Sequence, residues 1–153
     1  MILEAEYNFI MTEFNFSVPI DVRYGDLDPQ WHVNNARFLT YLENARMRYI
    51  MSLGLFDGED FFDFNLIVAD IHIAYKAPIK MTQKVNVWIR AEKLGHKSLT
   101  FVYEIKDEVT NHVLATAETI MVTYDYHQQK SILIPDKWRQ AISMREGVDY
   151  TKK

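Results

Sequence analysis

The polar side chains with the clearest chemical potential lie together in one stretch of the sequence, immediately before an amphipathic helical pattern. They are Asp26, Asp28, His32, Asn34 and Asn35. The first N–H groups of a helix have no partners within the helix and carry the positive end of its dipole. Such groups can polarise a carbonyl oxygen while a nearby carboxylate acts on the carbonyl carbon. The same residue types also favour turns and helix caps for local reasons, so the pattern by itself leaves both interpretations open.

Other common chemistries lack their residues in this sequence. There is no Gly-x-Ser-x-Gly elbow for a serine hydrolase, and the five glycines are too scattered for a phosphate-binding loop or a dinucleotide fingerprint. The chain has no cysteine, and its five histidines show no metal-ligand spacing. The sequence therefore predicts a reaction that needs neither a cofactor nor a metal.

Length and composition predict a single folded domain over residues 1–153. Hydrophobic residues make up 48% and charged residues 25%, which is typical of a globular protein. The net charge of −4 gives no general attraction to nucleic acid. No apolar run approaches the ~20 residues that span a bilayer, and the amino end has no basic leader. We therefore expect a cytoplasmic protein without nucleic acid or membrane partners, whose residues 1–12 form a loose tail.

Hydrophobic periodicity predicts one long helix followed mainly by strands. The helix covers residues 35–53, and its apolar stripe runs through Leu39, Leu42, Ala45, Tyr49, Ile50 and Leu53. Period-two alternation predicts strands at residues 14–22, 67–75, 85–91, 99–105 and 113–124, and a short one at 130–134. A final helix is expected over residues 135–147, with Pro135 at its first position.

These elements predict an α+β domain in which a curled antiparallel β-sheet of about five to six strands wraps a long central helix. Short connections favour a meander of consecutive strands. Pro19 cannot donate a backbone hydrogen bond, so the first strand should lie at a sheet edge or contain a bulge.

The loop and the helix together resemble the motif of the hotdog-fold acyl-CoA thioesterases, most closely the 4-hydroxybenzoyl-CoA thioesterase-like family. The matching segments are Asp26-Leu27-Asp28, His32-Val33-Asn34-Asn35, Phe38, Tyr41 and Glu43-Asn44-Ala45-Arg46. Weaker similarity covers about residues 14–140. The resemblance implies the hotdog fold and hydrolysis of an acyl-CoA thioester to a free acid and CoA.

The resemblance also implies roles for individual residues. Asp28 would be the catalytic carboxylate, as nucleophile or as general base, and the N–H of Asn35 or its neighbour would bind the thioester oxygen. His32 and Asn34 would shape the loop and cap the helix. Where the family has a glycine this chain has Trp31, so a turn that tolerates positive φ must be built differently or filled by the indole, which could also wall the acyl pocket.

Two further carboxylates of the motif are interpreted as structural. Asp26 is expected to fix the loop, and Glu43 to form an ion pair with Arg46 or Arg48 along the helix.

A basic turn later in the chain is a candidate for binding the phosphates of CoA. It contains Lys93, His96, Lys97 and Ser98. Cationic side chains and hydroxyls suit phosphate oxygens, although a solvated turn of the same composition needs no ligand.

The resemblance implies an oligomer as well, because in this family strand edges pair across a two-fold axis and each active site uses both chains. A homodimer or homotetramer is therefore expected, and it would also cover exposed strand edges. Two other functions stay open. The acyl group could be carried by acyl carrier protein instead of CoA, or the domain could bind acyl thioesters without hydrolysing them.

Overall fold

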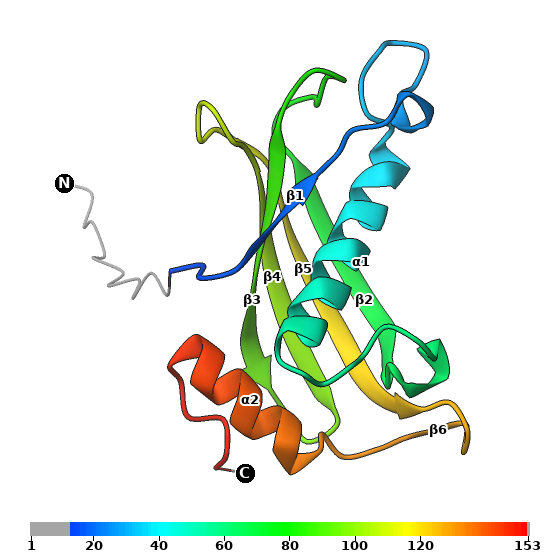
Figure 1. Cartoon of the computed structure of the whole chain (residues 1–153), viewed down its shortest axis with the longest axis vertical. Coiled ribbons are helices and arrows are strands. Elements are labelled where there is room, and N and C mark those ends of the chain that lie inside the picture. Colours follow the sequence, from blue (N-terminus) through cyan, green and yellow to red (C-terminus); the bar gives the residue numbers. More distant parts are fainter. Residues whose placement is uncertain (1–12, 153) are drawn as a thin grey trace, which may run out of the picture.

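The computed structural model describes residues 13–152, so the predicted tail at residues 1–12 lies outside the described part of the chain. The described elements, in chain order, are the following (Figure 1): β1 (Ser17–Ile20), η1 (Tyr24–Asp26), α1 (Asn35–Ser52), η2 (Phe61–Asp63), β2 (Leu66–Tyr75), β3 (Val85–Leu94), β4 (Ser98–Asp107), β5 (Val113–Asp125), β6 (Lys130–Ser131) and α2 (Asp136–Glu146). Every predicted strand and both predicted helices are present, within a few residues of their expected bounds. No helix in residues 13–152 combines the length and the apolarity that a membrane crossing requires.

The strands form one antiparallel sheet in the order β1-β3-β4-β5-β2, with β6 paired to β5. The expected meander is therefore correct for β3, β4 and β5 but wrong for β2, which pairs with β5 instead of β3. The edge of β3 that a full meander would give to β2 is taken by β1. Pro19 lies in β1 at the end of this order, as the missing N–H predicted.

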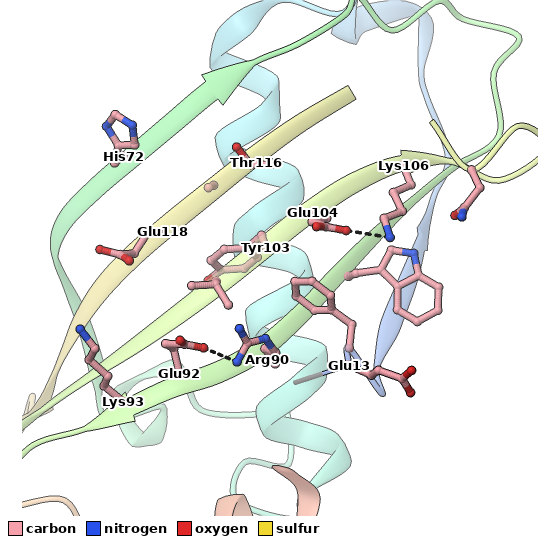
Figure 2. Close-up of a pocket in the computed structure, with 15 residues that line it drawn as sticks. Glu13, His72, Arg90, Glu92, Lys93, Tyr103, Glu104, Lys106, Thr116 and Glu118 are labelled. Atoms are coloured by element: carbon pink, nitrogen blue, oxygen red, sulfur yellow. Dashed lines mark ion pairs between the residues drawn. The ribbon is translucent and has the colours of Figure 1, made fainter. Parts of the chain in front are cut away.

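Alternate residues of the sheet face opposite environments. Along β4 the buried positions alternate strictly with half-exposed ones, and β3 follows the same pattern over most of its length. The half-exposed set faces away from α1 and carries charged residues such as Arg90, Glu104 and Lys106 (Figure 2). The buried set faces α1, so the sheet has one wet face and one face that packs on the helix.

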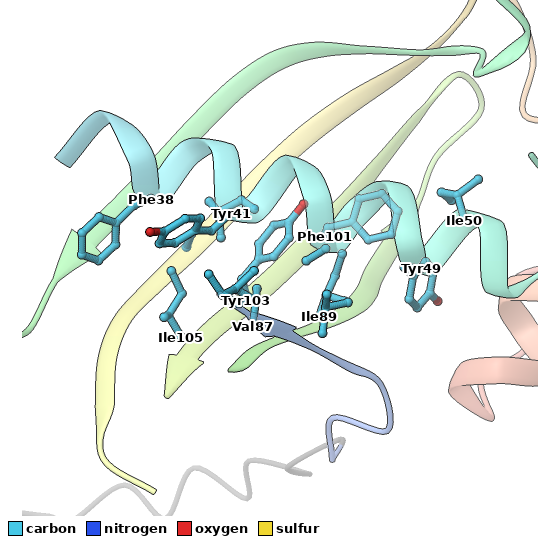
Figure 3. Close-up of a cluster of buried hydrophobic side chains, with 14 of the residues drawn as sticks. Phe38, Tyr41, Tyr49, Ile50, Val87, Ile89, Phe101, Tyr103 and Ile105 are labelled. Atoms are coloured by element: carbon cyan, nitrogen blue, oxygen red, sulfur yellow. The ribbon is translucent and has the colours of Figure 1, made fainter. Parts of the chain in front are cut away.

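The core forms where α1 packs against this buried face (Figure 3). Aromatic rings fill the layer, and the ring centroids of Tyr49 and Phe101 lie 5.5 Å apart in an edge-to-face arrangement. The predicted stripe is shifted, because Phe38 and Tyr41 are buried while Leu39 and Leu53 are only partly buried. The sheet curls around a wider arc of the helix than a single leucine stripe indicates.

Both ends of the core helix follow their local sequence. The side chain of Asn34 accepts a hydrogen bond from the N–H of Ala36 and so caps the start of α1. Gly54 follows the end of α1 with φ of +69°, a conformation that glycine adopts without strain. The second helix begins one residue later than predicted, because Pro135 occupies the cap position and Asp136 is the first helical residue.

A partly buried carboxylate joins α2 to the rest of the fold. Glu146, the last residue of α2, accepts hydrogen bonds through the same oxygen from the hydroxyl of Tyr49 on α1 and from the N–H of Ala91 on β3. Burial raises the pKa of Glu146 above its ordinary value, against the opposing effect of these hydrogen bonds. Because the folded-state pKa is raised, this group stabilises the fold at pH below its unfolded pKa, and that contribution is lost as the pH rises through the folded pKa.

We therefore expect Glu146→Gln to raise the midpoint of thermal unfolding at pH 7.5 and to have little effect near pH 4. Glutamine keeps an acceptor oxygen for Tyr49 and Ala91 but removes the buried charge. The gain should be below about 1 kcal/mol, since partial exposure screens the charge. Glu146→Ala is the control, because it leaves both donors without their acceptor and should destabilise at both pH values. A Gln variant that loses stability at pH 7.5 would contradict this interpretation.

Candidate active site

The loop between β1 and α1 is held against the segment that follows β2. Leu27 and Val33 form an isolated antiparallel bridge across the loop, and His32 bridges to Lys80. The N–H of Val33 donates to the carbonyl of Ile79 at 2.8 Å. These contacts fix the backbone of the loop on both sides of the polar residues that it presents.

Asp26 fixes the loop, as the sequence indicated. Its carboxylate accepts from the N–H of Arg23 at 3.0 Å and from the hydroxyl of Tyr41 at 2.9 Å, and its backbone carbonyl accepts from the N–H of Asn34. Arg37 lies 3.7 Å from the other carboxylate oxygen. Burial and the hydrogen bond to Asp26 raise the pKa of Tyr41, so its hydroxyl remains a donor throughout the physiological pH range. With its oxygens occupied in this way, Asp26 is poorly placed to act on a substrate.

Asp28 occupies the turn that leads to the helix. Its Oδ1 accepts from the N–H of Gln30 at 2.9 Å and from the N–H of His32 at 3.3 Å, and its own N–H donates to the carbonyl of His32 at 2.8 Å. These bonds orient the carboxylate through one oxygen. Within residues 13–152, no donor lies within hydrogen-bonding distance of Oδ2. Asp28 is thus a carboxylate with one oxygen fixed by the backbone and the other available.

Asp28 and the start of α1 line the same cleft, which has a volume of about 310 Å³. Its other lining residues include His32, Asn35, Phe38 and Tyr75. The Tyr75 hydroxyl donates to the carbonyl of Asn35 at 3.2 Å, and its ring packs edge-to-face on Phe38. Three of the four predicted catalytic-loop residues therefore meet in one cleft, and Asn34 adjoins them as the helix cap.

The cap determines which backbone donor is free. The N–H of Ala36 is occupied by the Asn34 side chain at 2.9 Å, and the N–H of Arg37 donates to the Asn34 carbonyl. For the N–H of Asn35, no acceptor lies in hydrogen-bonding range in the part of the chain that the structure describes. This group lies at the positive end of the helix dipole, and Asn35 and Asp28 line the same cleft. The arrangement can stabilise a negative oxygen at Asn35 beside an ionisable carboxylate.

The backbone at Trp31 is left-handed, with φ of +61°, so the turn has the positive φ that glycine would tolerate without strain. Its N–H donates to the Asp28 carbonyl at 3.0 Å, which closes the turn. The indole points outward, is 65% exposed and lies 6.3 Å from the ring of Tyr24. The turn is therefore kept with some backbone strain, and in the single chain the indole does not line the cleft.

The basic turn lies far from this cleft within one chain. The carbonyl of Lys97 accepts from the N–H of Thr123, and the carbonyl of His96 accepts from the N–H of Ile134. The ammonium group of Lys97 donates to Ser131 at 3.3 Å. Figure 1 places this β3–β4 turn at the end of the sheet near α2, opposite the start of α1. The structure brings Lys93, His96, Lys97 and Ser98 close to one another but not to Asp28.

Lys93 also lines a groove of about 790 Å³ on the wet face of the sheet (Figure 2). Glu92 forms an ion pair with Arg90 there, and Glu104 forms one with Lys106 at 2.7 Å. Glu13 and Glu118 line the groove as well. Because acidic side chains outnumber cationic ones in this groove, it is a poor match for the phosphates of CoA. The large volume of the groove is not by itself evidence that it is the active site.

Two features near the site were not visible in the sequence pattern. No role in the site was predicted for Tyr75, yet its hydroxyl contacts the helix start. Glu43 was expected to pair with Arg46 or Arg48, but Arg46 is buried and donates to the hydroxyl of Tyr103 at 3.2 Å. Among the described residues, Glu43 has no cationic nitrogen within 4.0 Å. Helical spacing predicts which residues of α1 lie next to Arg46, but it does not predict that the curled sheet covers this side chain.

Comparison with known proteins identifies the family. A family model described as the thioesterase-like superfamily matches residues 22–142, so this chain belongs to that superfamily. The long-chain acyl-CoA thioesterase FadM of Escherichia coli is 28% identical over 123 residues, which cover 80% of this chain and 93% of that protein. The fold and family expected from the loop motif are thus confirmed, and the chain is a thioester hydrolase.

Solved structures agree with this assignment. A thioesterase from Thermus thermophilus, crystallised with coenzyme A and zinc, is 31% identical, with a TM-score of 0.76 over 86% of this chain and 94% of that one. A 1,4-dihydroxy-2-naphthoyl-CoA thioesterase from Synechocystis is 22% identical and shares the fold, with a TM-score of 0.74 over 83% of this chain and 94% of that one.

The strained turn yields a stability prediction. Trp31→Gly should be more stable than Trp31→Ala by about 1 kcal/mol in chemical denaturation, because both remove the indole but only glycine relieves the left-handed strain. Equal stability of the two variants would show that the left-handed backbone conformation at residue 31 does not destabilise the fold.

Proposed function

We propose that this protein hydrolyses acyl-CoA thioesters at the cleft formed by Asp28 and the start of α1. One observation carries the proposal: a carboxylate with a free oxygen and an unoccupied helix-start N–H line the same cleft. The names of its relatives support CoA as the carrier, since FadM is a long-chain acyl-CoA thioesterase and the Thermus thermophilus structure holds coenzyme A.

In the proposed reaction, the thioester oxygen accepts a hydrogen bond from the N–H of Asn35. Asp28 either takes a proton from a water whose oxygen attacks the carbonyl carbon, or attacks that carbon itself to form an anhydride that water then cleaves. The negative charge that develops on the oxygen is stabilised by the Asn35 N–H and the helix dipole. Collapse of the tetrahedral intermediate breaks the C–S bond. The CoA thiolate is a good leaving group and needs no strong acid.

His32 and Asn34 act in this proposal through the loop. Asn34 occupies the N–H of Ala36 and so leaves the N–H of Asn35 as the unoccupied donor at the helix start among the described residues. The backbone of His32 holds Asp28 from both sides, by accepting from its N–H and by donating to its carboxylate. These contacts support positioning roles for both residues.

We propose further that the active unit is a homodimer, or a homotetramer built from it, joined through β2. This strand is at the end of the sheet, and its apolar side chains Ile67, Val68 and Ile71 are 40%, 39% and 37% exposed. A ten-residue edge of this kind presents a free row of backbone donors and acceptors to a second copy. Antiparallel pairing about a two-fold axis would set Tyr75 of one chain beside Leu66 of the other.

Such pairing would unite groups that lie apart in one chain. Tyr75 contacts Asn35, so the β2 end that carries Tyr75 belongs to the catalytic cleft. Leu66 pairs with Thr123, whose N–H donates to the carbonyl of Lys97, so the other end of β2 lies beside the basic turn. The basic turn of one chain would then approach the cleft of the other and bind the CoA phosphates there.

The same pairing would supply an acyl site. The cleft at Asp28 is small and partly polar, whereas a groove of about 580 Å³ between α1 and β2 is walled mainly by apolar side chains. Its walls include Met47, Phe61, Phe64, Ile67, Met121 and Tyr126. Because this groove lies toward the Leu66 end of β2, the groove of one chain would adjoin the cleft of its partner.

Replacing Asp28 by Asn tests the chemistry. The amide oxygen can still accept from the N–H groups of Gln30 and His32, so the turn should fold normally. Loss of the carboxylate should reduce kcat by ~10²–10⁴ on a panel of acyl-CoAs from short to long and aromatic, with acyl carrier protein thioesters assayed in parallel.

Asp26→Asn is the matched control, since it alters a carboxylate of the same loop that contacts Tyr41 and not the cleft. It should lower kcat less than Asp28→Asn. Full turnover by Asp28→Asn with an unchanged melting temperature would refute the proposed role of this carboxylate.

Mixed oligomers test whether the site uses two chains. Lys93→Ala with Lys97→Ala should raise KM for acyl-CoA and leave kcat nearly unchanged. Mixing equal amounts of this double variant and Asp28→Asn, with exchange of subunits, makes about half of the dimers mixed, and each mixed dimer has one intact site of two. The mixture should therefore recover roughly a quarter of the wild-type rate at low substrate concentration. If the lysines and Asp28 serve a site within one chain, mixing restores nothing.

A further inference from the structure

Arg46 is a buried cation whose hydrogen-bonding capacity is largely unused. The residue is only 4% exposed. Its Nη1 donates to the hydroxyl of Tyr103, which is itself shared with the hydroxyl of Thr119 at 3.0 Å. Its Nε is buried without an acceptor, and no carboxylate oxygen of the described residues lies within 4.0 Å. One neutral partner is little compensation for burying a guanidinium with five N–H groups.

The same fold contains a second buried arginine, whose Nη atoms have more acceptors. Arg139 on α2 is also 4% exposed, and its two Nη atoms donate to the backbone carbonyls of Gly95, His96 and Tyr150. The Nε of Arg139 is buried without an acceptor, as is the Nε of Arg46, so the two residues differ only at their Nη atoms. The Nη atoms of Arg139 have three carbonyl acceptors, whereas those of Arg46 have one hydroxyl among the described residues.

The Nε of Arg46 has almost no accessible surface, so only the Nη donors of this residue can meet a ligand. Arg46 lines the groove between α1 and β2, and it is a polar group among walls that are mainly apolar. In the function proposed above, on which this inference rests, the groove receives the acyl group. An apolar acyl chain would pack against the apolar walls but would leave the guanidinium without an acceptor. An acyl chain that carries an oxygen would pack against the walls and also accept a hydrogen bond from the guanidinium.

We propose that Arg46 selects acyl groups that carry a hydrogen-bond-accepting oxygen remote from the thioester. A hydroxyl and a carboxylate share this chemistry. Glu43 lies exposed at the same groove, so a hydroxyl can accept from Arg46 and still avoid repulsion by a second negative charge. A carboxylate can form the stronger, bidentate contact with the guanidinium fork. Arg46 is therefore a specificity residue, remote from the bond that breaks.

The experiment compares matched substrates at each of several chain lengths: the plain acyl-CoA, its ω-hydroxy analogue and its ω-carboxy analogue. At the chain length that the groove fits, kcat/KM for at least one oxygenated substrate should exceed that for the plain acyl-CoA by about tenfold or more. Arg46→Met should bring this ratio to about one. Arg46→Lys keeps the charge without the fork and should retain only part of the preference. The ω-hydroxy and ω-carboxy arms show which oxygen is preferred.

Two controls separate selection from a structural role. Arg48→Met removes the same charge from an exposed position of the same helix and should leave the ratio unchanged. The melting temperature of Arg46→Met should be equal to or above that of the wild type, because the variant removes a poorly compensated buried charge. Loss of stability with an unchanged substrate ratio would make Arg46 purely structural and overturn the proposal.

A binding measurement keeps this test independent of catalysis. In calorimetry, the free ω-hydroxy or ω-carboxy acid should bind the wild type at least about tenfold more tightly than the plain acid, and Arg46→Met should abolish the difference. If no thioester is hydrolysed but this difference is seen, the proposed function fails and the groove assignment stands. If every thioester is hydrolysed and the plain acyl-CoA is preferred, the selection by Arg46 is wrong and the hydrolase stands.

Discussion

The candidate site depends on how the first turn of α1 satisfies its backbone donors. Four N–H groups at a helix start have no partner in the helix. Here the Asn34 side chain occupies that of Ala36, and the N–H of Asn35, a residue that lines the cleft, has no acceptor among the described residues. The helix that carries this donor is the centre of the core, since Tyr49 and Ile50 near its other end are fully buried. The donor is therefore fixed by the packing of the whole domain, and in the proposed reaction it would meet the developing charge without rearrangement.

The loop before the helix gives its two carboxylates different roles through their partners. Asp26 is occupied by Tyr41, by a backbone N–H and by a nearby guanidinium, so it ties the loop to the helix. Asp28 lines the cleft, with one carboxylate oxygen held by backbone donors and no donor at the other among the described residues. Trp31 closes the turn that holds Asp28, and its left-handed backbone is strained for a residue with a side chain. The turn that positions Asp28 therefore contains local backbone strain.

Much of this arrangement could be predicted from the sequence because the signals are local. The cap at Asn34, the end of the helix before Gly54 and the edge position of Pro19 follow from the chemistry of single residues. The placement of β2 beside β5 and the burial of Arg46 could not be predicted, because both depend on which strands pair across the sheet. Periodicity shows which face of a strand is buried, but it does not show the strand's neighbour.

A crystal structure with a non-hydrolysable ketone analogue of an acyl-CoA would show whether the thioester oxygen binds at the N–H of Asn35 beside Asp28. We expect the ketone oxygen at about 2.7–3.1 Å from the backbone nitrogen of Asn35. We also expect the Asp28 carboxylate next to the carbonyl carbon, directly or through one water. An analogue whose carbonyl lies in the groove on the wet face of the sheet, or away from the start of α1, would contradict the proposed binding mode.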